Sequence, residues 1–91
     1  MPRYLLLIDT TTPTVGLLMG AVEVPPCFSP TDEFLGYCEE MELAVAIQTG
    51  EEFLTTWGGP VRPDDLARGK VLLDAMTAMR TADVYVKSTL N

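Results

Sequence analysis

The first apolar residues of the chain form a short continuous run, Tyr4 to Ile8, which ends at Asp9 and a turn-forming Thr-Thr-Thr-Pro segment. A short apolar run between turn residues is typical of a strand in the middle of a sheet with both faces covered. The sequence therefore predicts a strand over Arg3–Asp9. A second strand is predicted over Thr14–Val24, where β-branched residues recur, although part of this segment is also compatible with a helix.

Two glycines interrupt the second predicted strand, Gly16 and Gly20. Glycine weakens a strand because it has no side chain to pack, and in a strand it often marks a bulge or a place where another backbone segment approaches closely. Pro25 and Pro26 then end the strand, because proline cannot donate a hydrogen bond to a neighbouring strand.

Two later segments have the apolar spacing of helices. Phe34, Cys38, Met41 and Val45 recur every three or four residues, which predicts an amphipathic helix over about residues 31–45 with Thr31 or Ser29 as its cap. Proline followed by two acids at 63–65 is typical of a helix start, and an apolar stripe continues from there. This pattern predicts a second helix over about residues 64–80.

Three segments are less clear from the pattern. Residues 44–48 either continue the first helix or form a short strand, and Thr49-Gly50 is typical of a turn or a helix end. Residues 51–57 fit both a helical stripe and a strand. Alternating apolar and polar residues predict a strand over residues 82–88. The expected fold class is α+β in a single domain, 1–91, with a small, largely antiparallel sheet and two helices packed on one face.

Charge is unevenly distributed along the 91 residues. The net charge is −7, but the segment from Asp32 to Asp65 holds nine acids and only Arg62 as a base, so it carries −8 and the rest carries +1. Such a field repels nucleic acid and anionic membranes, and it suits solubility or a basic protein partner. With no secretory signal, no apolar stretch long enough to span a bilayer and only two cysteines, we expect a cytoplasmic protein.

The side chains that carry most enzyme chemistry are scarce. The chain has no histidine, which removes the commonest general base and most zinc sites. We therefore predict no catalytic residue, no metal site and no cofactor. The candidates for ligand binding are Asp9, Thr10, Glu40 and Trp57. The Thr10 hydroxyl at a strand end could hold an anion, the two carboxylates could face a metabolite, and Trp57 could line a pocket.

Three segments resemble YCII-related proteins. They are the apolar opening over residues 2–9, then Tyr37-Cys38-Glu39-Glu40-Met41, then Gly50-Glu51-Glu52-Phe53-Leu54; Gly69-Lys70-Val71-Leu72 matches the family's next strand. The resemblance implies a ferredoxin-like α+β dimer with a pocket near the sheet. The family's Asp-Gly-Pro-Phe signature is replaced by Asp74-Ala75-Met76-Thr77, so no catalytic residue carries over.

These observations support three hypotheses. The first is a non-enzymatic homo-oligomer, a dimer or larger, that also holds a small molecule, because two apolar helix stripes and five methionines are a large apolar surface for a small domain. The second is an acidic protein, an inhibitor or nucleic-acid mimic, that occupies a basic protein surface. The third is a small enzyme related to the YCII proteins.

Overall fold

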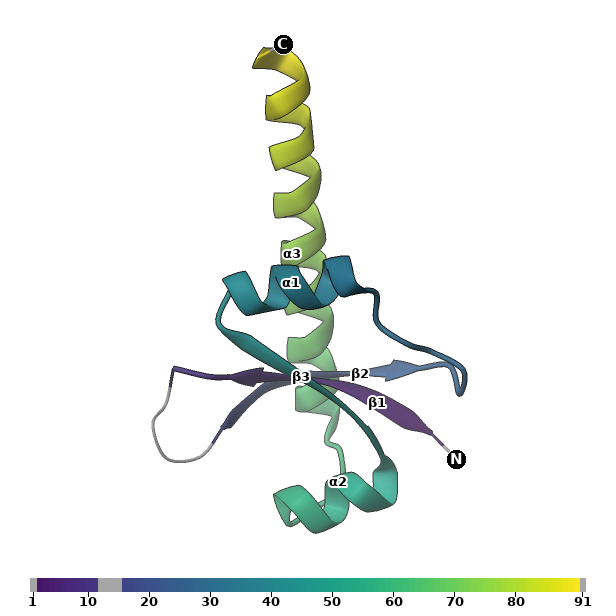
Figure 1. The fold of residues 1–91 in the computed structure, drawn as a ribbon. Coiled ribbons are helices and arrows are strands. Elements are labelled where there is room, and N and C mark those ends of the chain that lie inside the picture. Colours follow the sequence, from purple (N-terminus) through teal and green to yellow (C-terminus); the bar gives the residue numbers. More distant parts are fainter. Residues whose placement is uncertain (1, 12–15, 91) are drawn as a thin grey trace.

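The described part of the chain folds into a three-stranded sheet with three helices. The computed structural model describes residues 2–11 and 16–90, and the side chains as far as residue 78. In chain order the elements are β1 (Arg3–Asp9), β2 (Leu17–Val24), α1 (Asp32–Glu40), β3 (Leu43–Thr49), α2 (Gly50–Trp57) and α3 (Pro63–Leu90). The α+β class predicted from the sequence is confirmed (Figure 1).

The central strand of the sheet is β1, which pairs antiparallel with β2 on one side and with β3 on the other. Its middle residues Leu5, Leu6 and Leu7 are almost completely buried. Successive side chains of a strand point to opposite faces, so a run of three buried leucines requires cover on both faces. The interpretation of the N-terminal apolar run as a central strand is thereby confirmed.

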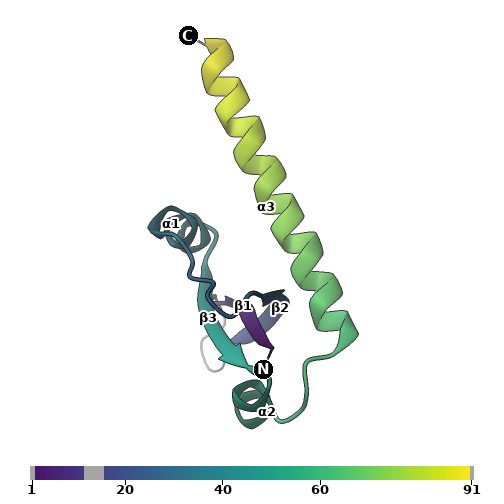
Figure 2. The ribbon, with the colours of Figure 1, turned by 90° about the vertical axis from the view of Figure 1, so that its right-hand side faces the viewer.

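Each face of the sheet carries its own apolar cluster. On one face Leu7 packs with Cys38 of α1 and Met76 of α3, so both helices predicted from the sequence reach this face, while Leu66 at the start of α3 packs on the other. On the other face Leu6 and Ala21 pack with Phe53 of α2. Figures 1 and 2 show the result, with α1 and α2 on opposite sides of the sheet and α3 beside β2.

The first helix is shorter than predicted, and the residues after it form a strand. Thr31 caps α1 by accepting a hydrogen bond from the Phe34 amide, and the helix ends at Glu40. Glu42 then adopts a left-handed conformation with a φ of 60°. Its carbonyl accepts hydrogen bonds from both the amide, at 3.0 Å, and the hydroxyl, at 2.8 Å, of Thr10. This contact turns the chain back along β1 as β3.

The undecided segment 51–57 is helical because a capping box starts it. The Thr49 hydroxyl accepts from the Glu52 amide at 3.2 Å, while the Glu52 carboxylate accepts from the Thr49 amide at 3.0 Å. Both contacts satisfy amides that the first helical turn leaves free. Gly58 ends α2 with a φ of 76°, a left-handed conformation that glycine adopts without steric cost.

Helix α3 lies against β2 through two glycines. A Cβ atom on Gly20 would lie 2.5 Å from the Gly69 Cα atom, and one on Gly69 would lie 2.1 Å from the Ala21 carbonyl oxygen. The two backbones therefore touch where neither residue has a side chain. The close approach expected at Gly20 is confirmed. The register also shifts between Leu7 and Ile8, which places a bulge in β2 beside this glycine.

Two sequence predictions for the C-terminal part are wrong. Residues 82–88, predicted as a strand, and residues 69–72, matched to a family strand, all belong to α3, which continues past the sheet (Figure 2). No proline follows Pro63, and Gly69 is the only glycine after it. Because extending an existing helix is favourable once its first turn has formed, a short alternating pattern does not end it.

Candidate functional site

A cleft of about 200 Å³ lies where α2, the loop after it and the start of α3 meet the sheet. Its lining comes from β2, α2, the loop over residues 58–62 and the first turn of α3, and consists of Leu18, Phe53, Trp57, Gly58, Gly59, Pro60, Arg62 and Asp65. A Cβ atom on Gly58 or Gly59 would meet nothing within 4 Å, so open space borders the loop.

Two aromatic rings form the apolar wall of the cleft. Phe53 and Trp57 are one helical turn apart on α2, and their ring centroids are 6.0 Å apart. Phe53 is buried in the core, whereas Trp57 is half-buried. The indole N–H of Trp57 is buried and has no hydrogen-bond partner. A buried donor without a partner costs about 1–3 kcal/mol, but because less than 1 Å² of this nitrogen is exposed, an acceptor can reach it only if the indole ring turns.

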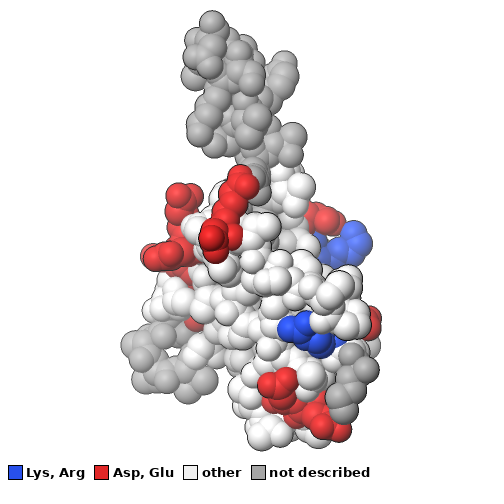
Figure 3. Space-filling model, turned by 45° about the vertical axis from the view of Figure 1, so that its right-hand side comes forward, with Lys and Arg blue, Asp and Glu red and all other residues white. Residues whose placement is uncertain are grey.

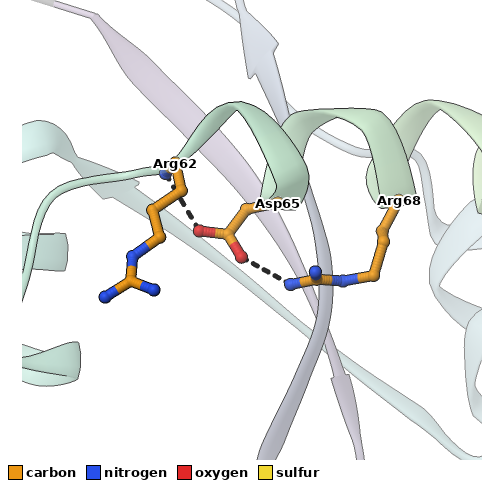
Figure 4. Close-up of polar contacts among 3 residues, drawn as sticks. All are labelled: Arg62, Asp65 and Arg68. Atoms are coloured by element: carbon orange, nitrogen blue, oxygen red, sulfur yellow. Dashed lines mark hydrogen bonds and ion pairs between the residues drawn. The ribbon is translucent and has the colours of Figure 1, made fainter.

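Asp65 is a buried carboxylate with a structural role. It is 8% exposed. One of its oxygens accepts a hydrogen bond from the Arg62 amide at 3.0 Å, and the other forms an ion pair with the Arg68 guanidinium at 2.5 Å (Figure 4). The first contact satisfies the amide just before α3, as an acid in the first helical turn commonly does. The negative charge of Asp65 is therefore already balanced.

The Arg62 guanidinium, in contrast, has no partner among the described residues. Its side chain is exposed at the edge of the cleft and turns away from Asp65 (Figure 4). A guanidinium presents several N–H donors in one plane and pairs most strongly with carboxylate or phosphate groups. The cleft thus combines an aromatic wall with a free cation at its edge.

The four candidate residues predicted from the sequence do not come together. Trp57 lines the cleft, but Asp9 ends β1, Thr10 follows it, and both are occupied with other contacts. The Asp9 carboxylate accepts hydrogen bonds from the Thr11 hydroxyl at 2.6 Å and from the Thr11 amide at 2.8 Å. These two bonds lower the pKa of Asp9 below its ordinary value, because they favour the charged form.

Thr10 is occupied by the Glu42 carbonyl, and Glu40 is an exposed residue at the end of α1. Helix α1 packs on the face of the sheet opposite to α2, so Glu40 and Trp57 belong to different faces. The pattern of the sequence did not single out Arg62. The one feature of the sequence that could have pointed to Arg62 is that it is the only base between Asp32 and Asp65.

The acidic residues of the central segment are divided between the two sides of the sheet. Those of α1 lie on one side, and Glu51 and Glu52 of α2 lie on the other. Figure 3 shows separate acidic groups instead of one continuous patch. The association with a basic partner stays a prediction. Among the described residues no cluster of three or more acids, cysteines or histidines is placed to hold a metal ion.

The two cysteines are far from equivalent. Cys27 is exposed in the loop after β2, and Cys38 is completely buried in α1; both are free thiols. Burial raises the pKa of Cys38, because it disfavours the charged thiolate. Cys38 therefore belongs to the apolar core between α1 and the sheet.

Comparisons with protein-family models, with curated proteins and with solved structures find no match to this chain. The resemblance to YCII-related proteins accordingly stays a prediction. Within the described residues, no helix has both the length and the apolar character needed to cross a membrane.

Proposed function

We propose that this chain is a non-catalytic binding protein that holds a small, flat carboxylate in the cleft between α2 and α3. One observation carries the proposal. The aromatic ring of Trp57 lies in the wall of a cleft whose edge bears the Arg62 guanidinium, which has no partner among the described residues. A flat acid would place its ring against the aromatic wall and its carboxylate against Arg62.

The size of the cleft restricts the ligand class. A cavity of about 150 Å³ accommodates benzene, so the observed volume of about 200 Å³ suits an acid with one aromatic ring. For so small a ligand the attainable binding free energy is limited, and we expect a dissociation constant of roughly 1 mM for the simplest member of the class. A larger natural ligand would extend over the open 58–60 loop.

The charge of the ligand provides the sharpest test. Trp57 is the single tryptophan of the chain, so its fluorescence reports on the cleft without any label. We expect benzoate to change this fluorescence saturably and to bind at least several-fold more tightly than benzamide, its neutral analogue. The difference reflects the charge-assisted bond to Arg62.

Matched variants separate this site from general charge effects. Arg62→Gln should remove the preference for benzoate over benzamide. Lys70→Gln removes the same charge from an exposed residue of α3 that does not line the cleft, and it should leave the preference unchanged. Unsaturable quenching by both compounds, or equal loss of binding in the two variants, would contradict the proposal.

A further inference from the structure

Among the described elements, one edge strand of the sheet, β2, is covered by a helix, and the other, β3, is not. Helix α3 packs along β2 at the Gly20–Gly69 contact, so that edge is covered. Within residues 2–11 and 16–90, β3 has β1 as its only strand neighbour, and the ribbons of α1 and α2 lie above and below β3, not along its outer edge (Figure 1). An uncovered edge strand presents a row of unpaired amides and carbonyls.

The hydrogen-bond pattern identifies the groups at this edge. The Thr10 amide bonds to the Glu42 carbonyl, so in the antiparallel ladder Ala44, Ala46 and Gln48 direct their backbone groups toward β1. The alternate residues Leu43, Val45 and Ile47 direct theirs outward. The Thr49 amide fits the same alternation, because it bonds to the Glu52 carboxylate instead of to β1.

The exposed edge has none of the usual protection against pairing. Natural edge strands are commonly blocked by charged residues, by proline or by a bulge. Residues 43–49 read Leu-Ala-Val-Ala-Ile-Gln-Thr, with no charge and no proline, and β3 pairs with β1 without a register shift. The nearest charges on either side of this window are Glu42 and Glu51.

We propose that β3 pairs antiparallel with β3 of a second copy of this chain, about a twofold axis at Val45. In this register Val45 lies opposite Val45 of the other copy, and Leu43 lies opposite Ile47. Every outward amide and carbonyl of these three residues then finds a partner, and the two sheets join into one of six strands. The open edge gives the homo-oligomer expected from the sequence a defined interface.

A second copy fits this edge better than a peptide from another protein for two reasons. Residues 43–47 read Leu-Ala-Val-Ala-Ile, which is nearly the same in both directions, so an antiparallel copy places alanine opposite alanine and one large aliphatic residue opposite another. The capping box at Thr49 and the left-handed Glu42 end the strand on both sides, which limits pairing to the uncharged window.

Solution mass measured by light scattering over a range of protein concentrations is the first test. We expect a dimer that high salt strengthens, because each copy carries a net charge of −7 and salt screens their repulsion. Val45→Pro removes one outward amide but no bond to β1, and we expect a monomer. Ala44→Lys places a charge at an exposed edge residue and should also weaken the dimer at least tenfold.

Val71→Lys is the matched control, because it adds the same charge to an exposed position of α3. It should leave the dimer intact. A wild-type monomer at all concentrations, or a dimer that survives both Val45→Pro and Ala44→Lys, would overturn the proposal. Strand addition by a peptide partner would instead appear as a wild-type monomer that binds a strand-forming peptide, and this outcome also overturns it.

The register is tested by disulfide cross-linking in a Cys27→Ser background. Residues 44 and 46 of opposite copies form a pair that is not hydrogen-bonded, with Cα atoms about 4.5 Å apart, which a disulfide can bridge. Ala44→Cys and Ala46→Cys proteins should therefore cross-link when mixed, and neither should do so efficiently alone. Equal cross-linking of each variant with itself would contradict the twofold axis at Val45.

Discussion

Replacing Gly69 by alanine tests the contact that positions α3 against the sheet. A Cβ atom there would lie 2.1 Å from the Ala21 carbonyl oxygen, whereas ordinary contact begins at 3.4 Å, so the helix and the strand would have to separate by roughly 1.3 Å. A gap of that size removes about half of the dispersion attraction across the contact. The helix would lose part of the packing of Leu66, Leu72 and Met76.

The net effect follows from two opposing terms. Three apolar side chains that each contribute about 1.5–3 kcal/mol on burial lose roughly a third to a half of that, or about 3 kcal/mol together. The better helix propensity of alanine returns about 1 kcal/mol. We therefore expect Gly69→Ala to lower the free energy of unfolding by about 2 kcal/mol.

A second glycine provides the control. Gly36 lies within α1, and a Cβ atom on it would meet nothing within 4 Å, so Gly36→Ala should raise the free energy of unfolding by up to about 1 kcal/mol. Urea unfolding followed by circular dichroism measures both variants. If Gly69→Ala proved as stable as wild type, or if the two substitutions changed stability equally, the direct backbone contact would be refuted.

Three further predictions concern side chains outside the cleft. Cys27 should react rapidly with a thiol reagent in the folded protein, whereas Cys38 should react only at the rate of unfolding, and similar rates for both would contradict its burial. The hydrogen bond from the Thr49 amide lowers the pKa of Glu52, so this carboxylate stabilises the fold at neutral pH and loses that contribution as the pH falls through its folded pKa. In urea titrations the free energy of unfolding of wild type should therefore exceed that of Glu52→Gln by more at neutral pH than in acid. The same difference at both pH values would exclude this linkage. Glu42→Gly should raise the free energy of unfolding by roughly 0.5–1 kcal/mol, because glycine adopts a φ of 60° without steric cost. Urea unfolding measures the change, and a loss of stability would show that the Glu42 side chain has another role.

Local patterns predicted those elements whose signals lie within a few residues. The apolar run Leu5–Ile8 and the Pro63-Asp64-Asp65 start act through neighbouring backbone and are found in the structure, and of the two predicted caps, Thr31 and Ser29, it is Thr31 that caps α1. Residues 49–57 also carried a local signal, Thr49 followed by Glu52, which is the spacing of a capping box. That spacing resolves the choice between helix and strand which the apolar pattern left open.

The remaining features depend on contacts between distant segments. Nothing near Gly69 indicates that it meets Gly20, because the contact joins residues 49 positions apart. The early end of α1 likewise depends on Thr10, which holds the Glu42 carbonyl across the sheet. Of the candidate site, Trp57 was predicted from its residue type alone, whereas Arg62 became a candidate only when the fold left its guanidinium without a partner.

The indole N–H signal of Trp57 in an ¹⁵N–¹H correlation spectrum tests the central claim most directly, because the chain has one tryptophan and therefore one such signal. If benzoate stacks on the aromatic wall with its carboxylate against Arg62, the shielding by its ring should move this signal in a saturable manner, and Arg62→Gln should greatly reduce the shift. An indole signal that stays in place while benzoate is added, or that moves equally in wild type and Arg62→Gln, would contradict the assignment of this cleft as a carboxylate-binding site.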